Sequence, residues 1–458
     1  MPTPSVAALL AQDLEVVTVT DTSLIITWFT GSATESDAYG EPTPVPADTE
    51  LLLGEPGRPA TMRTVLHDAT PTPYHYAEIR GLEPGRTYAY LARSAGQAAA
   101  QTSLQFPGRH GSLDVPGLVT TLATPPGRYL FTVALAGDTH IGETVSGVIA
   151  ADWPQAFRQD PGLPPYPEAM LTGMLADLRA QPRRPVALII AGDMTAEAAP
   201  RDVTRARELL DEWGRLGTDY FVVRGNHDRP HTGTRYASGT LVEGTRDHHD
   251  CWGDVFPYPR QRLSAHELAG LRIIGLDTTT LDAASGTLDD DQLDDLRTVL
   301  ATDPDRPTLV CGHHPVTCES AVTTAAGPGF NLDEAKAREL ESLYARAPGV
   351  FFHHAGHTHR NNRTEANGSD GAGGTEFLEV AAVKEYPGGY SLLRLHTGGY
   401  LVSFYKTRAD LARQWSQRTR AEYFGIFPHY ALGTIADRNH MVRRDLSGLR
   451  PVEARNGL

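Results

Sequence analysis

From residue 129 onward, the 458-residue sequence repeats one short pattern five times: an apolar run, then a glycine, then an aspartate, an asparagine or a histidine. An apolar run that stops at a glycine predicts a buried strand that ends at a loop. In open α/β sheets, ligands bind outside the carboxyl ends of the strands. The five strand ends read Gly137-Asp138-Thr139-His140, Gly192-Asp193, Gly225-Asn226-His227-Asp228, Gly312-His313-His314-Pro315 and Gly356-His357-Thr358-His359.

One such glycine fits an ordinary turn, because Gly-Asp and Gly-His also follow strands by chance. Five in a single stretch indicate a shared functional site. Strands that alternate with helical segments predict a layered α/β domain. The expected strands are residues 129–136, 185–191, 220–224, 271–276, 307–311 and 349–353, followed by three consecutive antiparallel strands at 376–382, 389–396 and 399–405; the expected helices are 168–179, 201–214, 288–301, 332–347 and 409–424.

The residue types at the strand ends suit a transition metal. Asp138 and His140 are two residues apart, so an extended segment would place both side chains on one face, and His357 and His359 repeat that spacing. Carboxylate oxygens and imidazole nitrogens together suit Zn, Mn, Fe or Co better than Mg or Ca. Two such ions about 3.5–4 Å apart can clamp a phosphate and activate a water.

The combined motif set resembles the calcineurin-like metallophosphoesterase superfamily, over roughly residues 129–405. The resemblance implies a catalytic domain with a β-sandwich core flanked by helices, and two divalent transition-metal ions. It implies that the first ion is held by Asp138, His140 and His359, that the second is held by Asn226, His313 and His357, and that Asp193 bridges the two.

The resemblance also implies catalytic roles. His227, oriented by Asp228, would lie beside the phosphate as a charge stabiliser or general acid, and a metal-bridging hydroxide would be the nucleophile. Asn226 and His227 would contact substrate, and Arg360 is a candidate phosphate contact that fits a solvated loop residue equally well. The remaining histidines beside the ligands are expected to be packing or supporting residues: His314, His353 and His354.

Before residue 125 the sequence has only β-type signals. The segment from Leu82 to Tyr88 resembles the corner of fibronectin type III domains, where a tyrosine closes the turn into the next strand, and Trp28 lies upstream. We therefore expect three parts: an all-β fibronectin type III-like sandwich at 1–124, the catalytic domain at 125–406 and a polar tail at 407–458. The expected N-terminal strands are residues 14–20, 24–29, 49–53, 62–66, 74–79 and 87–92.

Purple acid phosphatases resemble this arrangement, since they also join a fibronectin-like domain to the same catalytic fold. They carry a tyrosine three residues after the bridging aspartate, where this chain has Ala196, and they lack the histidine found here as His140. The metal site thus resembles the Asp-x-His branch, which includes bacterial cyclic-nucleotide phosphodiesterases. Two insertions, 141–184 and 229–263, are expected to lie at the site and set substrate choice, the second with His231, Arg235, Tyr236, His248 and His249.

The composition of the chain limits the kinds of binding partner and the location that we expect. The net charge of −15 argues against a protein that grips a nucleic-acid backbone. Three cysteines, Cys251, Cys311 and Cys318, predict no disulfide framework and are expected to be small buried side chains. No apolar run approaches the roughly 20 residues of a membrane span, and residues 1–12 lack signal-peptide features, so a cytoplasmic location is expected.

The sequence thus predicts a dinuclear metal-dependent phosphohydrolase that cleaves a small phosphomonoester or phosphodiester, a cyclic nucleotide among the candidates. Two alternatives remain open. One is a nuclease of the same superfamily acting on DNA, which the acidic charge disfavours. The other is a non-catalytic scaffold, which the complete set of ligand types disfavours. The oligomeric state and the identity of the metals are left open.

Overall fold

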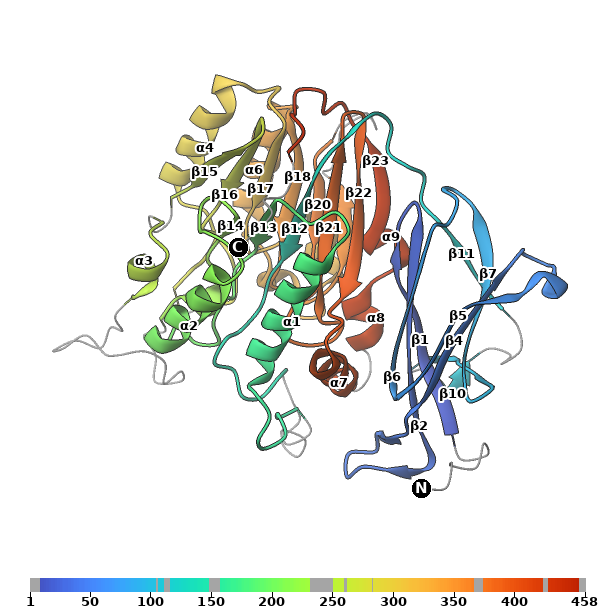
Figure 1. Ribbon diagram of the computed structural model, residues 1–458. Helices are drawn as coiled ribbons and strands as arrows, with labels where there is room; N and C mark the ends of the chain where they lie inside the picture. The colour runs from blue at the N-terminus through green and yellow to red at the C-terminus, as the bar shows by residue number, and fades with distance from the viewer. Residues whose placement is uncertain are drawn as a thin grey trace.

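The computed structural model describes residues 9–103, 106–110, 116–147, 157–230, 250–258, 262–281, 283–365, 374–422 and 427–452. These residues form a small N-terminal pair of β-sheets and a larger body built on two six-stranded sheets (Figure 1). The layered α/β expectation for the body is confirmed.

The first body sheet has the strand order β14-β13-β12-β21-β22-β23. Its first three strands are parallel, and the last three continue the sheet in antiparallel fashion. Burial of the continuous apolar runs on both faces explains why these segments form central strands. The bounds are β12 Tyr129–Ala136, β13 Ala187–Ile190, β14 Tyr220–Val222, β21 Gly389–His396, β22 Gly399–Lys406 and β23 Asn439–Arg443.

The second body sheet has the order β15-β16-β17-β18-β20-β19. Its four inner strands are mutually parallel, and an antiparallel strand lies at each edge. The bounds are β15 Ser264–Leu268, β16 Leu271–Gly275, β17 Thr308–Cys311, β18 Val350–Ala355, β19 Asn362–Glu365 and β20 Glu376–Glu379.

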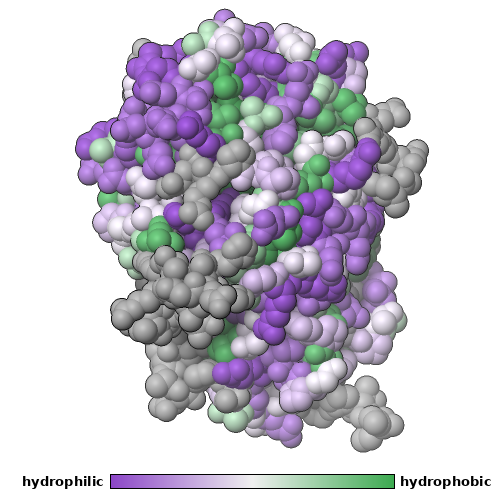
Figure 2. Space-filling view, turned by 90° about the vertical axis from the view of Figure 1, so that its left-hand side faces the viewer, coloured by the Kyte–Doolittle hydropathy of each residue, from purple (hydrophilic) through white to green (hydrophobic). Residues whose placement is uncertain are grey.

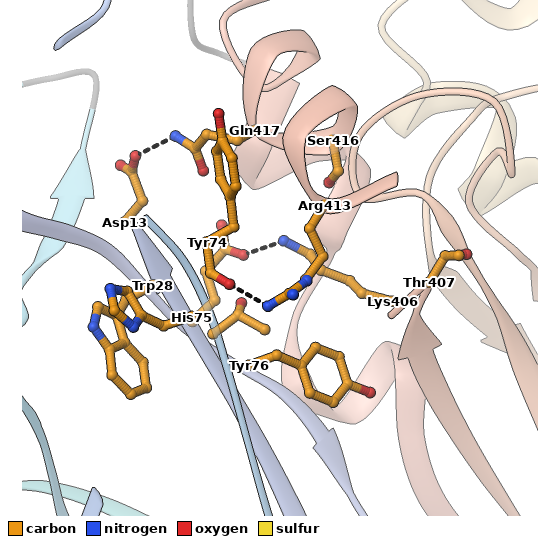
Figure 3. A pocket seen from close by; sticks show the side chains of 12 residues that line it. Asp13, Trp28, Tyr74, His75, Tyr76, Lys406, Thr407, Arg413, Ser416 and Gln417 are labelled. Atoms are coloured by element: carbon orange, nitrogen blue, oxygen red, sulfur yellow. Dashed lines mark hydrogen bonds and ion pairs between the residues drawn. The ribbon is translucent and has the colours of Figure 1, made fainter. Parts of the chain in front are cut away.

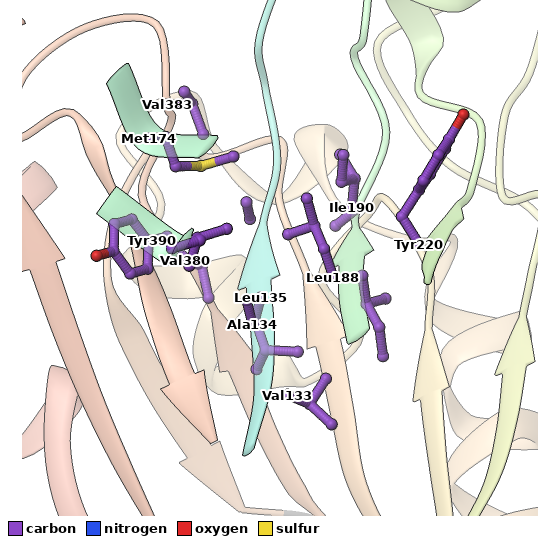
Figure 4. Close-up of a cluster of buried hydrophobic side chains, with 14 of the residues drawn as sticks. Val133, Ala134, Leu135, Met174, Leu188, Ile190, Tyr220, Val380, Val383 and Tyr390 are labelled. Carbon is purple, nitrogen blue, oxygen red and sulfur yellow. The ribbon is translucent and has the colours of Figure 1, made fainter. Parts of the chain in front are cut away.

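The two body sheets pack face to face, with helices on both outer sides. One buried cluster joins Leu135 and Ile189 of the first sheet to Leu309 and Phe352 of the second (part of it in Figure 4). The helices α1 (Tyr166–Ala180) and α2 (Pro200–Asp211) cover the first sheet with residues such as Met174 and Leu209, and α4 (Asp290–Thr302) and α6 (Glu334–Ala345) cover the second with residues such as Leu296 and Leu340.

One strand prediction was wrong in its pairing. Residues 376–382 were expected to begin an antiparallel set with the next two strands, but β20 pairs with β18 and β19 in the second sheet, whereas β21 and β22 pair in the first. The connection at residues 380–388 therefore crosses from one sheet to the other. Its apolar residues Val380 and Val383 are buried in the same hydrophobic cluster, with Val383 beside Met174 of α1 (Figure 4).

The N-terminal segment forms two sheets around a separate core. One has β1, β2 and β3 with β6 paired to β2, and the other has the order β11-β7-β4-β5 with β8 paired to β7. Trp28, Leu51 and Tyr90 share this core. The six expected strands are found, and the Tyr88 hydroxyl accepts a 3.0 Å hydrogen bond from Glu83 N. The bounds are β1 Leu9–Val19, β2 Ser23–Ser36, β3 Pro42–Pro44, β4 Ala47–Gly54, β5 Arg63–Thr72, β6 Tyr74–Arg80, β7 Thr87–Ser94, β8 Gln97–Ala98 and β11 Gly117–Thr120, with β9 Gln101–Ser103 and β10 Phe106–His110 as a separate pair.

The N-terminal sheets pack against the body and are joined to it by buried hydrogen bonds. Glu15 of β1 accepts hydrogen bonds from Tyr386, Lys406 and Arg420 at 2.6, 2.6 and 3.1 Å. A narrow pocket lies beside this contact, between β6 and the helix α7 (Asp410–Thr419), and Figure 3 shows Arg413 and Gln417 of that helix bonding across to Tyr74 O and Asp13. The tail is thus an integral part of the body surface, and α7 matches the expected helix.

Shorter elements complete the chain. Cys251 and Cys311 are buried as expected, whereas Cys318 is exposed at the start of α5 (Cys318–Thr323). The face that looks left in Figure 1 is mostly hydrophilic, with apolar side chains scattered over it (Figure 2). No helix in the described ranges is long and apolar enough to cross a membrane. The remaining elements are α3 Trp252–Val255, α5 Cys318–Thr323, α8 Phe427–Leu432, α9 Ile435–Arg438 and the 3-10 turns at Pro59–Thr61, Asn226–Asp228 and Pro328–Phe330.

Candidate metal centre

The five predicted strand ends meet at one place, where the carboxyl ends of parallel strands from both sheets face each other. β12, β13 and β14 deliver one set of side chains, and β17 and β18 deliver the other. The donor atoms of Asp138, Asp193 and His313 come within 4.8 Å of one another although they arise from three strands in two sheets. All seven predicted ligands are buried or nearly so: Asp138, His140, Asp193, Asn226, His313, His357 and His359.

The backbone reaches this geometry through left-handed conformations. Asp138, His140 and Asp193 have φ of 56°, 46° and 49°, and His357 and His359 have φ of 70° and 54°. Residues other than glycine rarely adopt positive φ, and such strain gathers at functional sites. The expectation that the side chains of Asp138 and His140, and of His357 and His359, share a face because their segments are extended was therefore wrong in its reason. The side chains converge because tight turns point them inward.

The first group of donors surrounds one point. His140 Nε2 lies 3.5 Å from an Asp193 oxygen, and His359 Nε2 lies 3.4 Å from an Asp138 oxygen. Ligands bound at about 2.0–2.2 Å to one ion lie about 3.0–3.5 Å from each other. These separations fit a shared cation.

The second group lies on the other side of Asp193. His313 Nε2 is 3.2 Å from an Asp193 oxygen, 3.0 Å from Asn226 Oδ1 and 3.0 Å from His357 Nδ1. His313 Nδ1 contacts the carbonyl oxygen of Ala191 at 2.6 Å, so it carries the proton and Nε2 has a free lone pair. Asp193 touches both groups, as a bridging residue would.

The donor set fits a metal by its chemistry. His140 Nε2, which faces Asp193, is buried without a hydrogen-bond partner among the described residues. The Asp193 carboxylate lies beside this nitrogen and accepts a 2.9 Å hydrogen bond from His227 N. Carboxylate, imidazole and amide donors packed this closely suit a divalent transition metal.

The His227 ring is held by a different partner from the one expected. The ring of His227 lies beside that of His140, with centroids 4.7 Å apart, and its Nδ1 is 2.7 Å from the carbonyl oxygen of Ala196. Asp228 was expected to orient this ring. Its carboxylate instead accepts hydrogen bonds from Met194 N, Thr195 N, Thr195 Oγ1 and Gly225 N at 2.9–3.1 Å. A backbone carbonyl has no signature in the sequence, so the partner of His227 could not be read there.

The expected phosphate contact of Arg360 is contradicted by its surroundings. Arg360 is 4% exposed and forms an ion pair with Glu379 at 2.8 Å. It also donates to the carbonyl oxygens of Thr323 and Ser320 at 2.8 and 3.2 Å. The guanidinium of Arg360 therefore stabilises buried groups of the body and is not presented to a substrate.

The neighbouring histidines have contacts of their own, and the expectation that they pack beside or support the ligands stays a prediction. His314 contacts Thr278, His353 contacts Tyr344 and His354 contacts the carbonyl oxygen of Ala136, at 2.7, 2.9 and 3.0 Å. Of the two insertions, the first brings Glu143 to within 2.9 Å of His140. The residues singled out in the second, His231, Arg235, Tyr236, His248 and His249, lie outside the described residues.

The structure is thus a two-sheet α/β sandwich whose strand ends carry a buried Asp/His/Asn cluster that could hold metal ions. The model of the calcineurin-like phosphoesterase family matches residues 131–361, which are 231 of the 458 residues. The chain belongs to the calcineurin-like phosphoesterase family, whose members are phosphoric ester hydrolases.

Two curated relatives are probable cyclic nucleotide phosphodiesterases. One from Synechococcus is 29% identical over 176 residues, which are 36% of this chain and 60% of that protein. One from Rhodococcus erythropolis is 31% identical over 150 residues, 32% of this chain and 45% of that protein. The chain thus spans about half the length of these relatives.

Two solved structures show a distant likeness in fold. A purple acid phosphatase from yellow lupin seeds has 16% identity and a TM-score of 0.41 over 87% of this chain and 72% of that chain. A dimetal phosphatase from Danio rerio has 17% identity and a TM-score of 0.40 over 60% of this chain and 95% of that chain.

Proposed function

We propose that the chain is a dinuclear metal-dependent phosphohydrolase that cleaves a small phosphodiester or phosphomonoester, with a cyclic nucleotide as the first substrate to test. Family membership supports the reaction class. The names of the two curated relatives support the substrate class.

One observation carries the proposal: five strand ends from two sheets bring seven ligand-type side chains to a single buried point, with Asp193 between two groups. Asp138, His140 and His359 would hold the first ion, and Asn226, His313 and His357 the second. When bound, two ions supply Lewis-acid polarisation of the phosphoryl group and of water.

The chain's own contribution to the proton movements would come from His227. The contact with the Ala196 carbonyl keeps the proton on Nδ1 and turns Nε2 toward the site. Burial lowers the pKa of His227 to about 4, so the free site holds a neutral ring. An anionic phosphate beside it would favour the protonated ring, which could then donate to the leaving oxygen. Asn226 would contribute an uncharged ligand and a substrate contact.

The division into a fibronectin type III-like sandwich at 1–124, a catalytic domain at 125–406 and a tail at 407–458 belongs to the same proposal. The separate core of the N-terminal sheets supports the first boundary. The hydrogen bond from Glu83 N to the Tyr88 hydroxyl supports the comparison with a tyrosine corner.

The direct test combines hydrolysis with elemental analysis on one sample. Purified protein would be incubated with Mn²⁺ and chromogenic phosphomonoesters and phosphodiesters, then with cyclic nucleotides. We expect bound transition metal and hydrolysis of at least one ester class. Metal-loaded protein that hydrolyses none of them would overturn the proposal.

A DNA-binding assay separates the nuclease alternative. We expect a DNA duplex to migrate unchanged on a native gel beside this acidic chain. Retarded migration together with strand cleavage would replace the small-molecule proposal with a nuclease.

A further inference from the structure

The crossing connection at residues 380–388 passes directly over the first group of ligands. Val383 N donates to Gly137 O at 3.1 Å, and Lys384 N donates to Asp138 O at 3.2 Å. This connection lies beyond residues 131–361, the part matched by the family model. It brings two charged side chains, Lys384 and Glu385, into the interior with exposures of 2% and 0%.

Glu385 supports one ligand. Its Oε1 is 2.7 Å from His359 Nδ1, the ring nitrogen opposite the one that faces Asp138. Its Oε2 accepts from Ser146 Oγ at 2.6 Å and pairs with Lys384 Nζ at 3.0 Å. Both carboxylate oxygens are therefore engaged.

Glu143 supports a second ligand in the same way. Its Oε2 lies 2.9 Å from His140 Nδ1, again opposite the nitrogen that faces the site. The contact is short but is not aligned as a hydrogen bond, so it is the weaker of the two. Glu143 Oε1 accepts from Lys384 Nζ at 2.6 Å and from the Tyr166 hydroxyl.

The chemistry of such contacts is general. A metal-ligating histidine usually donates its other ring N–H to a carboxylate or carbonyl, which fixes the tautomer and the ring orientation. A carboxylate at Nδ1 keeps the proton there, so Nε2 offers its lone pair to the site. His359 meets this condition through Glu385, and His140 has a carboxylate, Glu143, at the same ring position. The two carboxylates are joined to one lysine.

We propose that Lys384, Glu143 and Glu385 form a clamp of positioning residues that sets the rings of His140 and His359 for the first metal ion. The proposal rests on the proposed dinuclear function. Lys384 is central to the clamp because its ammonium group contacts the carboxylates of both Glu143 and Glu385. Without this cation the two buried negative charges would repel each other.

The clamp is in turn held by parts of the chain outside the family-matched segment. Trp415 Nε1 donates to Lys384 O at 2.8 Å, and Thr419 Oγ1 accepts from Tyr386 N at 2.9 Å, so α7 fixes the connection. The Tyr386 hydroxyl donates to Glu15 at 2.6 Å. The N-terminal strand β1 thus contacts Tyr386, the residue that follows Glu385 in the sequence.

The test measures metal affinity in four variants, Glu385→Gln, Glu143→Gln, Lys384→Met and Ser146→Ala. Mn²⁺ binding would be followed by competition with a chelator and by elemental analysis after dialysis. We expect about 10–100-fold weaker binding of one ion in Glu385→Gln and Lys384→Met, while the other ion stays bound. Glu143→Gln should lose less, because its contact is not aligned, and Ser146→Ala should lose least.

Glu376→Gln is the matched control. Glu376 is also a buried carboxylate 2.7 Å from a histidine, His440, but that pair lies on β20 and β23 away from the ligands. We expect this variant to lose thermal stability with metal affinity unchanged. In the clamp variants, excess Mn²⁺ should restore kcat, which a general loss of structure would not allow.

The outcomes separate the two proposals. If the unaltered protein binds metal and hydrolyses esters, yet Glu385→Gln and Lys384→Met bind Mn²⁺ as it does, the clamp is wrong and the function stands. If the unaltered protein holds no transition metal, the proposed function itself fails. Should Lys384→Met not fold, Glu385→Gln still decides, because it alters the contact with His359 directly.

Discussion

His227 Nδ1 lies 2.7 Å from the carbonyl oxygen of Ala196, three residues after the bridging Asp193. A carbonyl oxygen only accepts hydrogen bonds, so the contact fixes the tautomer of the ring. The backbone of Ala196, not its side chain, thus holds the histidine.

We expect His227→Ala to keep its metal and lose activity by about 10²–10⁴-fold, the usual contribution of a general acid or base. The ring contacts a carbonyl and lies beside the ligand His140, but it is not one of the seven predicted ligands. Elemental analysis and kcat on the same sample check this, with the exposed His67→Ala as control. Loss of metal in His227→Ala would show that the ring is a ligand.

We expect Asp193→Ala to lose both ions, because the Asp193 carboxylate lies 3.5 Å from His140 of the first group and 3.2 Å from His313 of the second. Metal content after dialysis is the measurement. Asp138→Ala serves as the comparison and should empty the first position while leaving the second. Equal metal content in the two variants would contradict a bridging role.

Asp228→Asn tests whether Asp228 supports the backbone instead of the His227 ring. Its carboxylate accepts from three backbone N–H groups and one hydroxyl, and an amide cannot accept all of them. Each charged hydrogen bond contributes about 1.5–3 kcal/mol, so the midpoint of urea unfolding should fall clearly. A variant with unchanged stability and a shifted pH profile of kcat would restore the orienting role.

Arg360→Met tests the buried ion pair with Glu379. Removing one partner of such a pair costs about 3–5 kcal/mol, because the other charge stays buried without its counter-ion. We expect lower stability in urea with KM unchanged at a temperature where the variant is folded. The opposite pattern, a raised KM with normal stability, would show that Arg360 contacts the substrate.

The contact between Glu15 and the body gives the junction a pH dependence. Burial alone would raise the pKa of Glu15, but Lys406 and Arg420 lower it from 4.5 to about 2. Because the folded-state pKa is the lower one, the stabilisation is present above pH 4.5 and is lost as the pH falls toward 2. Burial lowers the pKa of Lys406, so the pair contributes less than the roughly 3 kcal/mol that the Glu15 shift alone would give.

The measurement for this junction is thermal unfolding of Glu15→Gln against pH. We expect the variant to be less stable by about 1–3 kcal/mol at pH 7 and the difference to shrink between pH 4.5 and 2. Exposed Glu35→Gln is the control and should match the unaltered protein throughout. A difference that stays constant with pH would mean that Glu15 acts through packing alone.

Much of the fold was open to sequence reasoning because the signals are local. The apolar run of β12 and the glycine after it mark a buried strand and its end whatever the rest of the chain does. The pairing of β20 was not local, since its antiparallel partners were inferred from sequence order alone and the chain changes sheets at residues 380–388. Ligand types could be predicted, but the contacts of Asp228 and Arg360 could not, because several partners satisfy a buried charge equally well.

The sequence by itself determined which side chains lie at the five strand ends, because each short apolar run followed by a glycine indicates both a buried strand and the point where it ends. Only the tertiary structure decided how those side chains meet. It placed five ligands in left-handed turns, set the Ala196 carbonyl against His227 and brought Glu385 to His359. The physical reason is that these contacts depend on the packing of two sheets and a crossing segment, and no local pattern specifies the partner of a hydrogen bond across that distance.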